Sequence, residues 1–336
     1  MMKALARPAL AFVAIGLVLY AAVYYAAERL VYRTGDSNPF FKIATLDAPL
    51  VDWVILGASH AMPLDFDDFN AMMERETGLD IVNLAAQGTG PLYNRFAFEQ
   101  FLSRHRTGNV LYVLDSFAFR SKTWNEDRFA DAKLLARTPL DPSLLARFAR
   151  YSISEGVDPR ALADYVTGFS KINNRARFEQ DVWEGEGQFD RTHKPSKSAD
   201  AKRIEYLYPE SADDEAVFAR YAGELRALIE IAKAQGTTVV GIKLPVPKRF
   251  HDLLPDEAAF DGAMTELFAA AGGTFRDFSL TMDEAKFYFD TDHLNRTGLT
   301  EFFNRHLKAL LTTAAPAAGA ALSLRSPADD LPAERK

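Results

Sequence analysis

The stretch that decides the fold reads VDWVILGASH over residues 51–60. Its first part, 51–57, is a short apolar run that ends in Gly57, as a strand buried in a parallel sheet does. Ser59 and His60 follow directly, where the carboxyl end of such a strand presents side chains to a ligand. The stretch therefore predicts a buried strand followed by a serine that is a candidate nucleophile.

Apolar runs and helical segments alternate on either side of this strand. Further strands are expected at 80–86, 109–114, 237–244 and near 274–278, and helices at about 66–76, 91–106, 214–234, 256–271 and 298–311. Strands that alternate with helices across short links predict a parallel sheet covered by helices on both faces. The expected fold class is therefore α/β, with the ligand site at the carboxyl ends of the strands.

Two segments depart from this alternation. Residues of about 120–213 contain short helical pieces and a polar stretch without a clear period, and such length between two strands predicts an inserted helical or lid segment. Residues 312–336 are rich in Ala and Pro and show no apolar period, so we expect a disordered tail. The α/β domain is accordingly expected at 35–311.

An uncharged apolar run, ALAFVAIGLVLYAAVYYAA, occupies about 9–27. Roughly 20 such residues cross the hydrocarbon core of a bilayer as a helix. A cleaved signal peptide is the competing interpretation, but the run is long for one and lacks a convincing small-x-small cleavage site. We expect residues 1–34 to form a single-pass membrane anchor.

The charges beside this run predict its orientation. Lys3 and Arg7 precede it and favour a cytoplasmic N-terminus, although Arg29 and Arg33 on the other side weaken the bias. The chain after about residue 30 is then expected outside a bacterial inner membrane, in the periplasm.

Composition excludes several classes of function. The 336 residues carry a net charge of −7 without a basic block, which argues against a nucleic-acid partner because phosphate contacts need clustered Lys and Arg. The chain has no cysteine, so disulfides, thiolate zinc sites and cysteine nucleophiles are excluded. Covalent chemistry therefore falls to Ser59.

A second motif, FDTDHLNRTG, occupies residues 289–298 between the last expected strand and the last helix. A histidine base needs a carboxylate at its other ring nitrogen, and Asp290 stands three residues before His293 in this loop. The alternative is a helix-start loop in which Asn295 or Thr297 is the cap and the aspartates are solvated.

Ser59 after the first strand, together with Asp290 and His293 before the last helix, resembles the SGNH hydrolase superfamily, also called GDSL-type esterases. The resemblance covers about 51–311 and implies a flavodoxin-like three-layer α/β/α sandwich. It implies Ser59 as nucleophile, His293 as base and Asp290 as the residue that orients the base. Gly88, in NLAAQGTG, matches the glycine whose N–H joins that of Ser59 in the oxyanion hole.

Two positions depart from the pattern of that superfamily. Ala58 replaces the aspartate of the common Gly-Asp-Ser block, and Leu114-Asp115-Ser116-Phe117 stands where Gly-x-Asn-Asp is usual. Loss of one oxyanion donor typically costs about 10²–10³ in rate. Ser116 is a substitute donor and Asn94 a more remote candidate for donor or substrate contact, whereas Asp115 aimed into the hole would repel the oxyanion.

Further side chains are candidates for contacts with substrate or metal. His60, beside the nucleophile, is a candidate substrate contact. Asp290, Asp292 and His293 with His251 suggest metal-dependent phosphoester hydrolysis as an alternative, but no histidine pair has ligand spacing. We therefore expect neither a metal nor another cofactor.

With its anchor, the chain resembles bacterial envelope members of the superfamily, such as the alginate and peptidoglycan O-acetyltransferases and related polysaccharide esterases. The resemblance implies ester hydrolysis or O-acyl transfer on an acylated polysaccharide, with a multi-spanning membrane protein as a possible acyl donor. A different class of function also remains, in which a degenerate domain of this fold binds a glycan or a partner without catalysis.

Overall fold

The computed structural model describes residues 2–209 and 215–314, and the chain divides into two units. One unit comprises Met1–Leu46 with Glu126–Trp183, and the other comprises Asp47–Asn125 with Glu184–Lys336. The residues expected to form the insertion thus divide between the units. Of the tail expected at 312–336, residues 312–314 continue the last described helix, which ends at Ala314, and the rest lies outside the described residues.

The second unit is built on a five-stranded parallel sheet with the order β2-β1-β3-β4-β5. This is the strand order of flavodoxin-like folds. The strands are β1 (Leu50–Leu56), β2 (Ile81–Asn83), β3 (Arg106–Val113), β4 (Thr238–Lys243) and β5 (Thr274–Asp277). Trp53, Val54 and Ile55 in the middle of β1 are inaccessible to solvent, which explains why this strand reads as a continuous apolar run.

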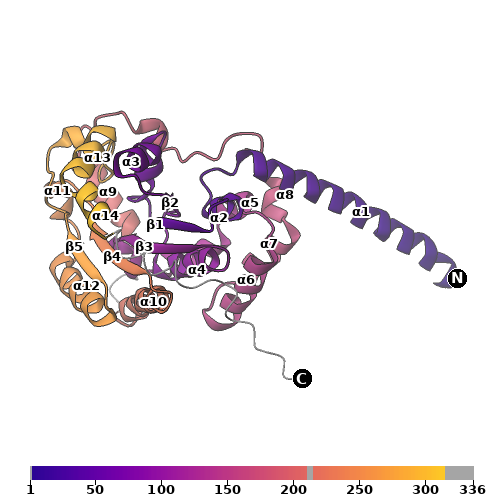
Figure 1. The fold of residues 1–336 in the computed structure, drawn as a ribbon. Helices are drawn as coiled ribbons and strands as arrows, with labels where there is room; N and C mark the ends of the chain where they lie inside the picture. The colour runs from indigo at the N-terminus through magenta and orange to yellow at the C-terminus, as the bar shows by residue number, and fades with distance from the viewer. Residues whose placement is uncertain (1, 210–214, 315–336) are drawn as a thin grey trace, which may run out of the picture. The chain divides into compact units, whose positions relative to one another are not determined.

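Helices cover both faces of the sheet (Figure 1). One layer contains α4 (Pro91–Leu102), α10 (Glu215–Ala234) and α12 (Glu257–Ala271), and the other contains α3 (Phe69–Thr77), α13 (Arg296–Phe302) and α14 (Lys308–Ala314). A π-helical turn at Phe303–Leu307 joins α13 to α14. The three-layer α/β fold expected from the sequence is confirmed.

Two helices differ from the expectation. The helix expected to reach residue 106 ends at Leu102, because Arg106 already starts β3 and its N–H donates to Pro49. The polar stretch expected to lack a period contains α9 (Lys197–Leu207), capped by Ser196. This helix buries only Asp200 and Leu207, so it has no apolar stripe for a periodicity argument to detect.

The other unit is entirely helical in its regular structure over the described residues. It contains α1 (Met2–Thr34), α2 (Pro39–Thr45), α5 (Ala132–Arg137), α6 (Pro142–Ser154), α7 (Pro159–Thr167) and α8 (Phe169–Asn173). Asp141 and Asp158 cap α6 and α7, each followed by a proline that suits the first helical position. The part of α1 from Arg7 to Thr34 is long and apolar enough to cross a membrane.

Candidate active site

The turn after β1 holds Ser59 at the carboxyl edge of the sheet. Gly57 has φ +147°, and a Cβ there would lie 2.8 Å from the carbonyl oxygen of Val113, so the turn requires glycine. The amide oxygen of Asn94 accepts from the N–H of Gly57 at 3.0 Å, and its nitrogen donates to Gly90 at 2.9 Å. Asn94 therefore ties this turn to the start of α4, and we do not assign it to substrate.

The loop before α13 brings His293 to this serine. Nε2 of His293 lies 2.9 Å from Oγ of Ser59, although the two residues are 234 positions apart in the chain. Nδ1 of His293 lies 2.8 Å from Oδ2 of Asp290. The three side chains that the two sequence motifs single out thus form one chain of hydrogen bonds.

Local bonds hold this loop in shape. Oδ1 of Asp290 accepts from the backbone N–H of His293 at 2.8 Å and from that of Asp292 at 3.1 Å. Asn295 caps α13 by accepting from the N–H of Gly298 at 2.9 Å. The cap and the histidine–aspartate pair, which are alternatives when the sequence is considered alone, are both present.

Asp292 is a second carboxylate beside His293, and it is fully buried. Its Oδ1 lies 3.3 Å from Nδ1 of His293, and its Oδ2 lies 2.9 Å from Nε of Arg203 on α9. Burial raises the pKa of Asp292, but the charge of Arg203 and the bonds to histidine outweigh burial and hold the pKa well below its ordinary value. Asp292 is therefore ionised at neutral pH.

His60 lies between two carboxylates. Its Nδ1 is 2.5 Å from Oδ1 of Asp115, and its Nε2 is 3.3 Å from Oδ2 of Asp292. Burial disfavours the imidazolium, yet the two carboxylates raise the pKa of His60 to about 10. At neutral pH His60 is a cation, and we assign it to the charge balance of the site.

The two histidine rings lie against each other, with centroids 4.5 Å apart and planes at 33°. Burial lowers the pKa of His293, whereas Asp290 and Asp292 raise it by a larger amount, so the net pKa lies above the ordinary value. The positive charge of His60 acts in the opposite direction and pulls the pKa of His293 down. His60 thereby offsets part of the rise in pKa that the two aspartates cause at His293.

Gly88 and Ser116, the two residues that the sequence suggests as oxyanion donors beside Ser59, differ in their surroundings. Gly88 has φ +63°, a conformation that favours glycine, and the neighbouring Thr89 hydroxyl donates to Gly57 at 3.0 Å. The hydroxyl of Ser116 is bonded to Tyr208 at 2.6 Å and to Glu257. Ser116 is engaged in a buried network, so we do not assign it to the oxyanion hole.

His60, Asp292 and His293 also place potential metal-ligand atoms within 4.8 Å of one another. Each of these side chains is already bonded to a protein group: His60 to Asp115, Asp292 to Arg203 and His293 to Ser59. A metal ion there would compete with Arg203 for the carboxylate of Asp292. His251, the fourth ligand considered from the sequence, lies on α11 (Lys248–His251) outside this cluster.

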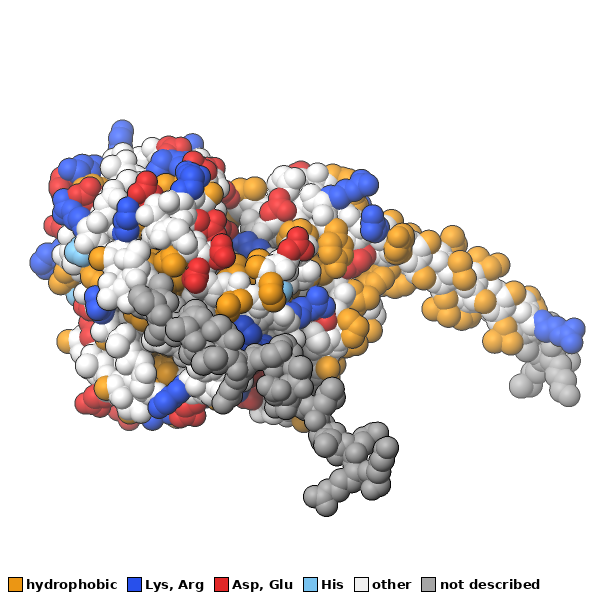
Figure 2. All heavy atoms as spheres, viewed as in Figure 1, with side chains coloured by type: hydrophobic (Ala, Val, Ile, Leu, Met, Phe, Trp, Pro, Cys, Tyr) orange, Lys and Arg blue, Asp and Glu red, His pale blue; other side chains and the backbone are white. Residues whose placement is uncertain are grey.

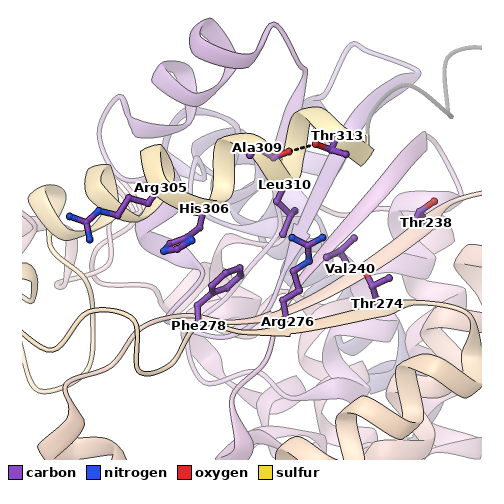
Figure 3. Close-up of a pocket in the computed structure, with 10 residues that line it drawn as sticks. All are labelled: Thr238, Val240, Thr274, Arg276, Phe278, Arg305, His306, Ala309, Leu310 and Thr313. Carbon is purple, nitrogen blue, oxygen red and sulfur yellow. Dashed lines mark hydrogen bonds between the residues drawn. The ribbon is translucent and has the colours of Figure 1, made fainter.

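Two cavities lie at different places on the sheet. A cavity of about 30 Å³ adjoins the site and is lined by His60, Asp115 and Tyr208 among others. A groove of about 410 Å³ lies between the β4–β5 side of the sheet and α14, lined by Phe278 and Leu310 among others (Figure 3). None of the candidate site residues lines this larger groove.

Arg203 is the site residue that sequence reasoning missed. It stands on α9, a helix without an apolar stripe, and no motif surrounds it. The position of Asp292 beside His293 is visible in the sequence, but its pairing with Arg203 and His60 depends on tertiary contacts.

No family model and no curated protein matches this chain. Among solved structures, it is similar to a protein of Bacteroides fragilis described as a "putative acylhydrolase". The two share 11% sequence identity, the alignment covers 82% of this chain and 95% of that chain, and the TM-score is 0.39. A likeness of this size does not carry a function from one protein to the other.

Proposed function

We propose that this chain is a serine-dependent acyl-ester hydrolase or O-acyltransferase of the SGNH type, acting on an acylated polysaccharide of the cell envelope. The observation that carries the proposal is the bonded series Ser59, His293 and Asp290, with contacts of 2.9 and 2.8 Å. Nucleophile, base and orienting carboxylate within hydrogen-bond distance are what nucleophilic acyl transfer requires.

In the proposed reaction, Oγ of Ser59 attacks the ester carbonyl carbon while Nε2 of His293 takes the hydroxyl proton. The tetrahedral intermediate collapses, His293 returns the proton to the leaving alcohol, and an acyl-serine remains. The backbone N–H groups of Ser59 and Gly88 are the proposed donors to the oxyanion. Asp290 keeps the His293 ring in the tautomer with its proton on Nδ1.

The second half of the reaction reverses these roles. His293 deprotonates an acceptor hydroxyl, which attacks the acyl carbonyl and releases the serine oxygen with a proton from His293. Water as acceptor gives the free acid, and a sugar hydroxyl gives a new ester. In the second case the acyl group comes from a donor, for which we propose a multi-spanning membrane protein.

His60 has a supporting role in this mechanism. A general base must be neutral to accept a proton, and two carboxylates beside Nδ1 of His293 favour its charged form. The cation at His60, 4.5 Å from the base between ring centroids, favours the neutral form. We therefore assign His60 as a positioning residue that acts through His293.

The location follows from α1 and its flanking charges. The apolar helix is proposed as a single-pass anchor in a bacterial inner membrane, and Arg7 ahead of it favours a periplasmic position for the rest of the chain. An ester-bearing envelope polysaccharide is accessible to the site in that compartment.

A fluorophosphonate probe, which phosphonylates activated serines, tests the mechanism. Labelling is expected in the wild type, absent in Ser59→Ala and at least 100-fold slower in His293→Ala. His251→Ala, a histidine outside the site, is the matched control and should label like the wild type. Equal labelling of the wild type and Ser59→Ala would refute the serine mechanism.

A second candidate function is glycan or partner binding without catalysis. It is favoured by Asp115, which stands where the superfamily has its oxyanion asparagine and instead contacts His60. It predicts no turnover of p-nitrophenyl acetate and binding of an acetylated polysaccharide that Ser59→Ala leaves unchanged.

A further inference from the structure

We propose that the corner between α7 and α8, residues Val166–Phe169, is embedded in the bilayer beside α1. The helical unit would then be seated in the membrane surface rather than tethered above it. This inference rests on the membrane anchor in the proposed function, and all of its contacts lie within one unit.

Three contacts fix the level of this corner along α1. The hydroxyl of Tyr20 donates to the carbonyl of Thr167 at 2.8 Å. Gly168 packs so closely on Tyr24 that a Cβ there would lie 1.9 Å from its ring. The ammonium of Lys171 lies 5.4 Å from the centroid of the same ring. The corner therefore lies at the level of Tyr20 and Tyr24.

The length of helix ahead of Tyr20 is too short to cross a bilayer. An α-helix rises about 1.5 Å per residue, so about 20 Å separate Arg7 from Tyr20, and about 26 Å separate Lys3 from Tyr20. The hydrocarbon core is about 30 Å thick, and tilting the helix only increases the shortfall. The membrane must therefore extend past Tyr20, to the level where the α7–α8 corner is attached.

The surface of the corner suits this position. Val166 and Phe169, on either side of Thr167 and Gly168, are 48% and 63% exposed. In water such exposed apolar side chains are unfavourable, whereas bilayer immersion removes them from solvent. Figure 2 shows that apolar side chains also cover α1 where it projects from the unit.

Two charged side chains lie beside the corner. Asp164 accepts from the N–H and from the hydroxyl of Ser170 at 2.8 and 2.5 Å. Lys171 is bonded to Glu28 on α1, and the two side chains are only 2% and 14% exposed. Charged groups at membrane depth are stable only when paired or facing the protein interior. The ion pair therefore allows the corner to enter the bilayer without exposing an unpaired charge at this contact.

Site-specific fluorescence tests the inference, since the chain has no cysteine and one introduced thiol carries the only label. The full chain is reconstituted in nanodiscs of phosphatidylcholine and phosphatidylglycerol and labelled with NBD (nitrobenzoxadiazole) at Phe169→Cys. Leu17→Cys reports on the anchor itself. Tyr32→Cys is the matched control, 45% exposed on the same helix and about 18 Å beyond Tyr20.

Lipids that carry a nitroxide near the top of the acyl chain are expected to quench NBD fluorescence at least twofold more strongly at position 169 than at position 32. Aqueous dithionite should reduce the NBD group at least fivefold more slowly at position 169 than at position 32. Val166→Cys should repeat this result.

Quenching at 17 but accessibility at 169 equal to that at 32 would overturn the inference and leave the anchor standing. No quenching at 17 would overturn the anchor and the inference together. Strong quenching of equal size at 169 and 32 would place both positions inside the bilayer and would overturn the depth assigned to the corner.

Discussion

Replacing His60 by glutamine removes a buried positive charge beside the proposed base. The rings of His60 and His293 lie 4.5 Å apart between centroids, and both residues are more than nine-tenths buried. At that separation, two unit charges interact by about 3–4 kcal/mol when the effective dielectric constant is near 20. A change of one unit in pKa corresponds to about 1.4 kcal/mol, so the upper bound on the change in the pKa of His293 is about 2–3 units.

The sign of the change follows from the charges. The cation at His60 lowers the pKa of His293, so its removal raises that pKa. His293 acts as a base only when neutral, and the acid limb of kcat/KM reports its pKa in the free enzyme. We expect this limb to lie above about 6.5 in the wild type. In His60→Gln it should move at least about one further unit upward.

The assay is the pH profile of kcat/KM for p-nitrophenyl acetate. His60→Gln should lose at least tenfold at the pH of the wild-type acid limb and recover much of that loss at higher pH. His251→Gln, on α11, is the control and should keep the wild-type profile. An equal loss at every pH, with the limb unmoved, would mean that His60 only packs against His293 and would refute the reasoning.

Three further predictions concern the orienting aspartate, the turn after β1 and the metal alternative. Asp290→Asn should lower kcat by about 10²–10⁴ with little change in KM, since the correct tautomer of the base is lost; a loss below tenfold would show that Asp292 orients His293 instead. Gly57→Ala should destabilise the protein by at least about 1–3 kcal/mol in urea unfolding, because φ is +147° and Val113 obstructs a Cβ. Gly262→Ala, where nothing lies within 4 Å, should be neutral or stabilising, and equal effects at both glycines would contradict this account of the turn. Incubation with EDTA should leave ester hydrolysis unchanged, and a loss that added divalent metal restores would favour the metal-dependent alternative.

Several features could be predicted from the sequence because they depend on local physical chemistry. A strand buried on both faces is apolar where it is buried, as Trp53–Leu56 are, so β1 is recognisable from residues 51–57 alone. The turn at Gly57 places Ser59 at the sheet edge, and an Asp three residues before a His bonds within its own loop, as Asp290 and His293 do. Each of these patterns lies within about ten residues of chain.

The charge balance of the candidate site was decided by tertiary structure. Arg203 reaches Asp292 from α9, and Asp115 reaches His60 from the end of β3, across separations of 89 and 55 residues. A helix held by ion pairs has no apolar period, which explains why α9 was not expected. The partners of Ser116 likewise come from distant segments.

The sequence by itself therefore determined the α/β layering, because the apolar period specifies it, and it supplied the two motifs whose resemblance to SGNH hydrolases singles out Ser59, His293 and Asp290. Tertiary structure decided which charged groups surround His293 and therefore its pKa. The physical reason is that the pKa of His293 depends on every charge within a few ångströms. Those charges, on Asp292, His60 and through them Arg203 and Asp115, come together only when the chain is folded.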